Sequence, residues 1–280
     1  MMASTSISAT ALEARILRTH EESDLDRITS PTIQAVIYTP DIVPDWFHEV
    51  EEAVEHEFLQ IPRTILPAAE RQEIDAWIEN NLPSDVLTLA TRGALKQDIL
   101  GLTGRIARMT GALRFHFRIF TGAPTSNCGF HVDTVSPGAA NWGLLRVFNG
   151  DGTEYVDPDG VTSMRAFYLY LSRRERLERE RGEASTGGDP ERFAQLDAEI
   201  KILDRECGFM THTGSVQVVP SRSIVAFKHL DVSLHWSDHP KALAWIHCSP
   251  MAGRPRLVVN VTAVPTSLGM AHRGTGEMVR

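Results

Sequence analysis

The spacing of hydrophobic and polar positions changes near residue 113. Between residues 31 and 112, apolar side chains recur every three or four positions, which is typical of amphipathic helices. Helices are predicted over the stretches 45–58, 67–81, 84–96 and 98–110. Gly111 suits the end of the last of these helices. Residues 1–30 are expected to form an N-terminal tail or an edge segment.

From Leu113 onward the pattern becomes that of strands. The stretch LRFHFRIF at 113–120 alternates large apolar and polar side chains, as in a strand with one buried face. Strands are predicted at 113–120, 142–149, 164–171, 215–219, 223–227, 243–247 and 256–263. Short strands separated by turn residues indicate a sandwich or a barrel. We therefore expect one α+β domain, with the N-terminal helices of 31–112 packed on a β core that spans 113–280.

The stretch 171–206 interrupts this run of strands. It holds 36 residues, of which 18 are charged, and it begins with the solvated sequence SRRERLERERGE. Asp189 followed by Pro190 is a favourable helix start. The second helix has an apolar stripe at Phe193, Leu196, Ile200 and Leu203. We expect a helical hairpin, either a plain surface element or a lid over a site at the barrel mouth.

Composition narrows the class of protein. The chain has 280 residues and a net charge of −8, which disfavours nucleic acid as a partner. Its three cysteines exclude a complete disulfide framework, and no apolar run is long enough for a membrane helix. The first residues do not resemble a secretory signal. The Walker, Rossmann and GxSxG motifs are absent. We expect a cytoplasmic enzyme that acts on a small molecule, with no membrane partner.

Metal-binding chemistry is indicated by three residues. His131 and Asp133 are two positions apart in extended chain, so both side chains lie on one face. An HxD pair alone is common by chance, and without further support a buried histidine beside a hydrogen-bonded aspartate is the favoured explanation. His247, at the end of a predicted strand, offers a third ligand. Two imidazoles and one carboxylate occupy one face of Fe(II) and leave the other positions open. Arg256 begins the next strand, and its planar fork suits a carboxylate.

The order HxD, then a distant histidine, then an arginine nine residues on resembles the iron(II)/2-oxoglutarate-dependent oxygenase superfamily. More narrowly, the chain is similar to a bacterial family described only as a domain of unknown function. The stretches that carry this similarity are FHVD at 130–133, GDGTEY at 150–155, AFK at 226–228, HCSP at 247–250 and LVV at 257–259.

The resemblance implies a double-stranded β-helix, of the jelly-roll or cupin-like kind, that uses Fe(II), 2-oxoglutarate and O2. It implies hydroxylation or desaturation of a small organic substrate, with release of succinate and CO2. His131, Asp133 and His247 would bind iron, and Arg256 would bind the distal carboxylate of 2-oxoglutarate. Further candidates for substrate contacts or support of the site are Arg118, His116, Arg146, Thr153, Glu154, Lys228 and His235. The stretches 136–141 and 171–206 look inserted relative to the narrower family, so the substrate class does not carry over.

Several alternatives stay open at this point. The chain is alternatively a cupin-like metal enzyme that does not use 2-oxoglutarate, or a metal-binding module without catalysis. His235 is a second candidate for the distal ligand, and Arg254 competes with Arg256 for the carboxylate. A zinc site could use Cys128, His131, His247 and Cys248. Surface or loop positions are expected for His212, His229 and His239.

Overall fold

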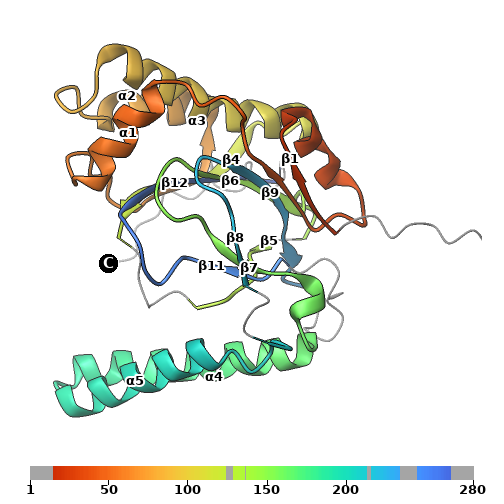
Figure 1. Cartoon of the computed structure of the whole chain (residues 1–280), viewed down its shortest axis with the longest axis vertical. Helices are drawn as coiled ribbons and strands as arrows, with labels where there is room; N and C mark the ends of the chain where they lie inside the picture. Colours follow the sequence, from red (N-terminus) through yellow and green to blue (C-terminus); the bar gives the residue numbers. More distant parts are fainter. Residues whose placement is uncertain (1–14, 124–128, 136, 213–215, 234–244, 266–280) are drawn as a thin grey trace, which may run out of the picture.

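The computed structural model describes residues 15–123, 129–135, 137–212, 216–233 and 245–265. The strands of the large sheet lie in the order β1-β2-β9-β6-β12-β4-β3, and a smaller sheet has the order β11-β7-β8 (Figure 1). The large sheet consists of β1 (Ile16–Thr19), β2 (Ala35–Tyr38), β3 (Thr64–Glu70), β4 (Arg114–Gly122), β6 (Trp142–Val147), β9 (Ile224–Lys228) and β12 (Arg256–Ala263). The smaller sheet consists of β7 (Glu154–Val156), β8 (Val216–Val218) and β11 (His247–Cys248). A short parallel pair joins β5 (Thr134–Val135) to β10 (Leu230–Asp231).

The helices lie on the two outer sides of these sheets. One face of the large sheet is covered by α1 (Trp46–Glu55), α2 (Arg71–Asn81) and α3 (Leu89–Thr110) (Figure 1). A hairpin of α4 (Met164–Thr186) and α5 (Pro190–Glu206) lies beyond the smaller sheet (Figure 1). The 3-10 helices η1 (Glu22–Thr29) and η2 (Pro158–Gly160) complete the described elements. The order of layers is therefore helices, large sheet, smaller sheet and helical hairpin.

Strict alternation in β4 separates two environments. Phe115, Phe117 and Ile119 are buried in the apolar cluster between the large sheet and the helices. His116 and Arg118 point to the other face, toward the smaller sheet. A second cluster fills part of the space between the sheets, with Val147, Tyr155, Phe227, Trp245 and Val258 among its members. A polar pair on β4 thus lies at the margin of an otherwise apolar interior.

The helix predictions for the N-terminal half are confirmed with changed limits. The helix expected over 67–81 begins only at Arg71, because residues 64–70 form β3 and pair with β4. The capping box of Glu70 and Glu73 closes the start of α2. The two helices expected over 84–110 are one helix, α3, which Thr88 caps and Gly111 ends at φ +71°. Residues 16–19 and 22–29, within the expected tail, form β1 and η1.

Strands were correctly predicted at 113–120, 142–149, 223–227 and 256–263, but the strand at 164–171 was wrong. Those residues form the first turns of α4, where the Ser163 side chain accepts a hydrogen bond from the Ala166 amide. Phe167 and Tyr170 are buried while Leu169 is exposed, a helical spacing. Short apolar runs do not separate helix from strand by their period.

The double-stranded β-helix stays a prediction. Within the described ranges the strands form no closed barrel. Of the predicted strand 243–247, only residues 245–247 are described, and β11 begins at His247. Residue 215 of the strand expected at 215–219 also lies outside the described residues, and β8 covers 216–218. In the described part of the chain, no helix is long and apolar enough to cross a membrane.

The turn at residues 149–152 has a physical reason for its sequence. The buried Asn149 amide donates to the carbonyl oxygen of Pro255 at 2.9 Å, and its oxygen accepts from the Leu257 amide at 2.9 Å. Gly152 passes so close to the next segment that a Cβ there would lie 1.7 Å from the carbonyl oxygen of Val219. The turn therefore joins the two sheets through contacts that a side chain at 152 would break.

We expect Gly152→Ala to lower the free energy of unfolding by about 3 kcal/mol, because the added methyl group must displace backbone. Urea unfolding measures the change. The control is Gly101→Ala on α3, where nothing lies within 4 Å of the added Cβ. That change should instead stabilise the protein by about 0.5–1 kcal/mol through helix propensity. Equal effects of the two substitutions would contradict the tight contact at Gly152.

Candidate metal centre

His131 and His247 are brought together by a single antiparallel bridge. The amide of His131 donates to the carbonyl of His247 at 2.8 Å, and the amide of His247 donates to the carbonyl of His131 at 2.9 Å. The segment of His131 thereby extends the smaller sheet beside β11. The two imidazole rings lie with their centroids 4.4 Å apart. Local spacing alone cannot create this pairing, since the two residues are 116 positions apart in the sequence.

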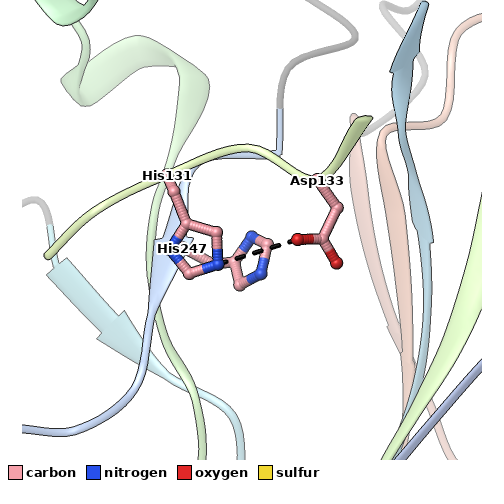
Figure 2. Close-up of side chains that lie close together, drawn as sticks. All are labelled: His131, Asp133 and His247. Carbon is pink, nitrogen blue, oxygen red and sulfur yellow. Dashed lines mark ion pairs between the residues drawn. The ribbon is translucent and has the colours of Figure 1, made fainter. Parts of the chain in front are cut away.

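Asp133 completes the cluster. Its Oδ1 lies 3.7 Å from Nε2 of His131, and one ligand atom from each of the three residues lies within 4.8 Å of the others. Figure 2 shows the three side chains directed toward a common point between two chain segments. Within the described residues, this is the group of histidine, cysteine and acidic side chains with the spacing of a metal site.

Backbone carbonyls set the orientation of both imidazoles. Nδ1 of His131 lies 3.0 Å from the carbonyl oxygen of Gly129, and Nδ1 of His247 lies 3.0 Å from that of Trp245. Because a carbonyl only accepts, each Nδ1 carries the hydrogen. Each Nε2 then carries a lone pair directed into the cluster, which is the form of histidine that binds metals.

Burial and neighbouring charges set the protonation states. Burial lowers the pKa of His247, and the adjacent His131 lowers it further. Burial alone would raise the pKa of Asp133, but His247, His229, His131 and Arg118 together hold it below its usual range. Neutral imidazole beside ionised carboxylate is the state in which both kinds of ligand bind a divalent ion.

A cavity of about 400 Å³ lies beside Asp133. Its polar lining comes from β4, β12 and the end of β9, and consists of His116, Arg118, His229, Asn260 and Thr262 together with Asp133 and Thr134. His116 and Arg118 were candidates from the sequence. His229 was expected at a surface or in a loop; it does lie outside the strands, between β9 and β10, but the surface position is wrong, because the residue is only 4% exposed. Its position directly after the apolar strand β9 was the feature of the sequence that indicated burial.

Four other candidates from the sequence do not line this cavity. Arg146 faces the helices instead and pairs with Asp98 of α3 at 3.1 Å. Thr153 is buried, and its carbonyl accepts from the Val219 amide. Glu154 accepts from the thiol of Cys248 at 3.6 Å. Lys228 is buried at the end of β9, where burial lowers its pKa. His235 and His239 lie outside the described residues.

The two candidate arginines near β12 differ sharply. Arg256 is buried and donates to the carbonyl oxygen of Asp151 at 3.2 Å. It begins β12 four residues before Asn260, which places it about 13 Å from the cavity along the strand. Arg254 is exposed and pairs with Glu55 at 2.6 Å. Arg256 is thus buried at the first position of β12, whereas Arg254 lies on the surface.

Cys248 faces away from the histidine cluster. It is buried in a third apolar cluster, with Phe130, Phe209 and Ile246, on the side of the hairpin. Consecutive residues of a strand point to opposite faces, so His247 and Cys248 serve different sides of the sheet. Cys128, the other cysteine of the suggested zinc set, lies outside the described residues.

The helical hairpin supports the segment that carries His131. The hydroxyl of Tyr170 accepts from the amide of Phe130 at 3.1 Å and donates to Asp204 of α5 at 2.6 Å. Arg174 donates from Nε to the same carboxylate at 2.9 Å. A Cβ at Gly129 would lie 2.2 Å from Nε of Arg174, so only glycine allows this approach.

This support was not evident from the sequence, although the predicted hairpin itself is confirmed. Asp189 caps α5 as expected, and Leu196, Ile200 and Leu203 are buried, while Phe193 is 39% exposed. None of the described residues that line the cavity beside Asp133 belongs to the hairpin. The base of the hairpin packs behind the smaller sheet, on the side opposite the large sheet.

Comparison with models of known protein families identifies the family of this chain. A family model described as "Protein of unknown function (DUF1826)" matches residues 19–186, which is more than half of the chain. This confirms the similarity to a family described as a domain of unknown function. The matched part contains His131, Asp133 and Tyr170, whereas His247 and Arg256 lie beyond it. No curated protein matches the chain.

Proposed function

The chain belongs to the DUF1826 family, and we propose that it is an Fe(II)/2-oxoglutarate-dependent oxygenase acting on a small organic substrate. The observation that carries the proposal is the convergence of His131, Asp133 and His247 with both Nδ1 atoms bonded to carbonyls. Two neutral imidazoles and one carboxylate on one side of an ion form the donor set of non-haem iron oxygenases.

The residues of the chain would divide the work as follows. His131 and His247 would bind the ion through Nε2, and Asp133 would bind it through a carboxylate oxygen. When bound, Fe(II) supplies open positions for 2-oxoglutarate and O2. Buried surroundings of His247, which is 6% exposed, keep bulk water from that side. The cavity beside Asp133 provides room for the molecule to be oxidised.

The order of the strands supports a double-stranded β-helix. If the short β5–β10 pair is left out and the His131 segment is counted as the second, the eight segments from β4 to β12 belong in turn to the large, small, large, small, small, large, small and large sheet. This mirror-symmetric order suits two sheets built from paired Greek keys, as in a jelly roll. The metal ligands would then lie on two neighbouring segments of the smaller sheet.

The resemblance assigns the distal carboxylate of 2-oxoglutarate to Arg256, and the buried position of that residue supports the assignment. We expect Arg256→Ala to weaken binding of 2-oxoglutarate to the Fe(II) protein roughly 10- to 1000-fold, because a charge-assisted bidentate contact is lost. Anaerobic titration followed by the visible charge-transfer band of the keto-acid chelate measures the affinity. The matched control is Arg254→Ala, which removes an exposed ion pair. Unchanged affinity in Arg256→Ala would contradict the assignment.

Metal analysis separates this function from the two alternatives. Purified protein loaded anaerobically should hold about one Fe(II) per chain, bind 2-oxoglutarate and form succinate when O2 is admitted. A zinc hydrolase of the cupin type would retain zinc and ignore 2-oxoglutarate. A metal-binding module without catalysis would hold metal and consume no O2.

A further inference from the structure

We propose that the cavity beside Asp133 binds the carboxylate group of a small organic acid through Arg118, and that this acid is the substrate. The assignment of this acid as the substrate rests on the proposed function. The binding site itself rests on the cavity and its side chains. Nothing in the family description assigns a ligand to it.

Arg118 is the only arginine or lysine among the described residues that line this cavity. It lies on β4 directly opposite Asn260 of β12, and His116 lies opposite Thr262. Its Nε is buried without a hydrogen-bond partner, and no described carboxylate forms an ion pair with its guanidinium. A half-buried arginine whose buried Nε lacks a partner favours a planar anion that accepts hydrogen bonds from its guanidinium group.

His229 provides the second, independent observation. Its side chain lines the cavity, the residue is only 4% exposed, and its Nε2 has no described hydrogen-bond partner. The imidazole ring packs against Gly143 of β6, which has no side chain; a Cβ there would lie 3.0 Å from Nε2 of His229. A buried polar atom without a partner costs free energy unless a ligand or water satisfies it.

The remaining charges of the cavity define where the acid sits. Asp133 is the one carboxylate among the described lining residues, and its charge disfavours an anion in its own vicinity but not at the Arg118 side of the cavity. Arg118, His116 and His229 surround the rest of the polar lining. A carboxylate held at Arg118 therefore leaves the remainder of a small molecule directed toward the triad.

Size also favours a small acid. The cavity of about 400 Å³ lies at the lower end of the range for ligand pockets. Arg256, about 13 Å away along β12, marks a separate place for a second carboxylate. Each arginine would therefore bind the carboxylate of a different acid, with the cosubstrate at Arg256 and the substrate at Arg118.

The test uses metal-free protein, with butanoate as the probe and butanamide as its neutral counterpart. We expect butanoate to bind in the millimolar range and to shift the amide NMR resonances of Asn260 and Thr262, while butanamide does not. Arg118→Leu should weaken butanoate binding at least tenfold. The matched control is Arg114→Leu on the same strand, whose arginine pairs with Glu70 outside the cavity; it should bind as the wild type does.

A second arm identifies the source of the carboxylate. If the cavity holds the substrate, Arg118→Leu leaves the anaerobic titration of the Fe(II) protein with 2-oxoglutarate within about twofold of wild type. A parallel loss of affinity for butanoate and for 2-oxoglutarate would show that the cavity binds 2-oxoglutarate, and would overturn the substrate assignment. The binding site itself is overturned if butanoate and butanamide behave alike in wild-type protein, a result that needs no variant to fold. Failure to hold iron would end the proposed function and leave the butanoate result standing.

Discussion

The Asp133→Ala variant should lose most of its Fe(II). The substitution removes the only negatively charged ligand of the cluster and leaves two neutral imidazoles, which lie 4.4 Å apart between ring centroids. Carboxylates supply much of the affinity of a mixed nitrogen and oxygen site for a divalent ion. Iron content after anaerobic loading and desalting should fall from about one ion per chain to a small fraction.

The control for this prediction is Asp159→Ala. Asp159 is 93% exposed in its side chain and lies 3.8 Å from Arg15, so its loss changes the net charge equally without touching the cluster. Iron content should stay unchanged. Full retention of iron in the double variant His131→Ala and Asp133→Ala would rule out this site, whatever the single variants do.

Asp204→Ala should destabilise the protein by about 3 kcal/mol and weaken metal binding with it. Asp204 is the shared partner of Tyr170 and Arg174, and its side chain is 1% exposed. Breaking a buried pair by removing one partner costs about 3–5 kcal/mol. The lower end applies, because Glu178 also pairs with Arg174 at 2.7 Å and keeps that charge partly compensated.

The effect should reach the metal ligands through Phe130, whose amide donates to the Tyr170 hydroxyl one residue before His131. Urea unfolding and iron titration together measure both consequences. The matched control on the same helix is Asp197→Ala, which removes partly exposed ion pairs with Arg181 and Lys201. Such pairs contribute less than about 1 kcal/mol. Equal stability of the two variants would contradict the stabilising role of the network, and equal iron affinity would show that the hairpin does not support the cluster.

The parts of the fold that were predictable from the sequence are those with a clear local period. β4 and β12 alternate between a helix-covered face and a polar or apolar interior face, and both lie where the alternation predicted them. The apolar run at 164–171 failed, because its side chains suit a buried helix as well as a strand. Its helix depends on the cap at Ser163 and on packing of Phe167 against Phe209.

The candidate site was predictable only in its ligands. The HxD spacing places His131 and Asp133 on one face, but the register that adds His247 is a long-range pairing. The network of Tyr170, Arg174 and Asp204 escaped prediction for the same reason, since its members come from two helices and contact a third segment. A single aspartate beside the apolar stripe of α5 was the only local sign of it.

The most direct test of the proposed function is an anaerobic titration of the Fe(II)-loaded wild-type protein with 2-oxoglutarate, followed by admission of O2. The proposal predicts a visible charge-transfer band that saturates at about one 2-oxoglutarate per iron, and succinate formed after O2 is added. Both should be absent in Asp133→Ala. Iron bound at the cluster with no band at any concentration of 2-oxoglutarate, and no succinate after O2, would contradict it.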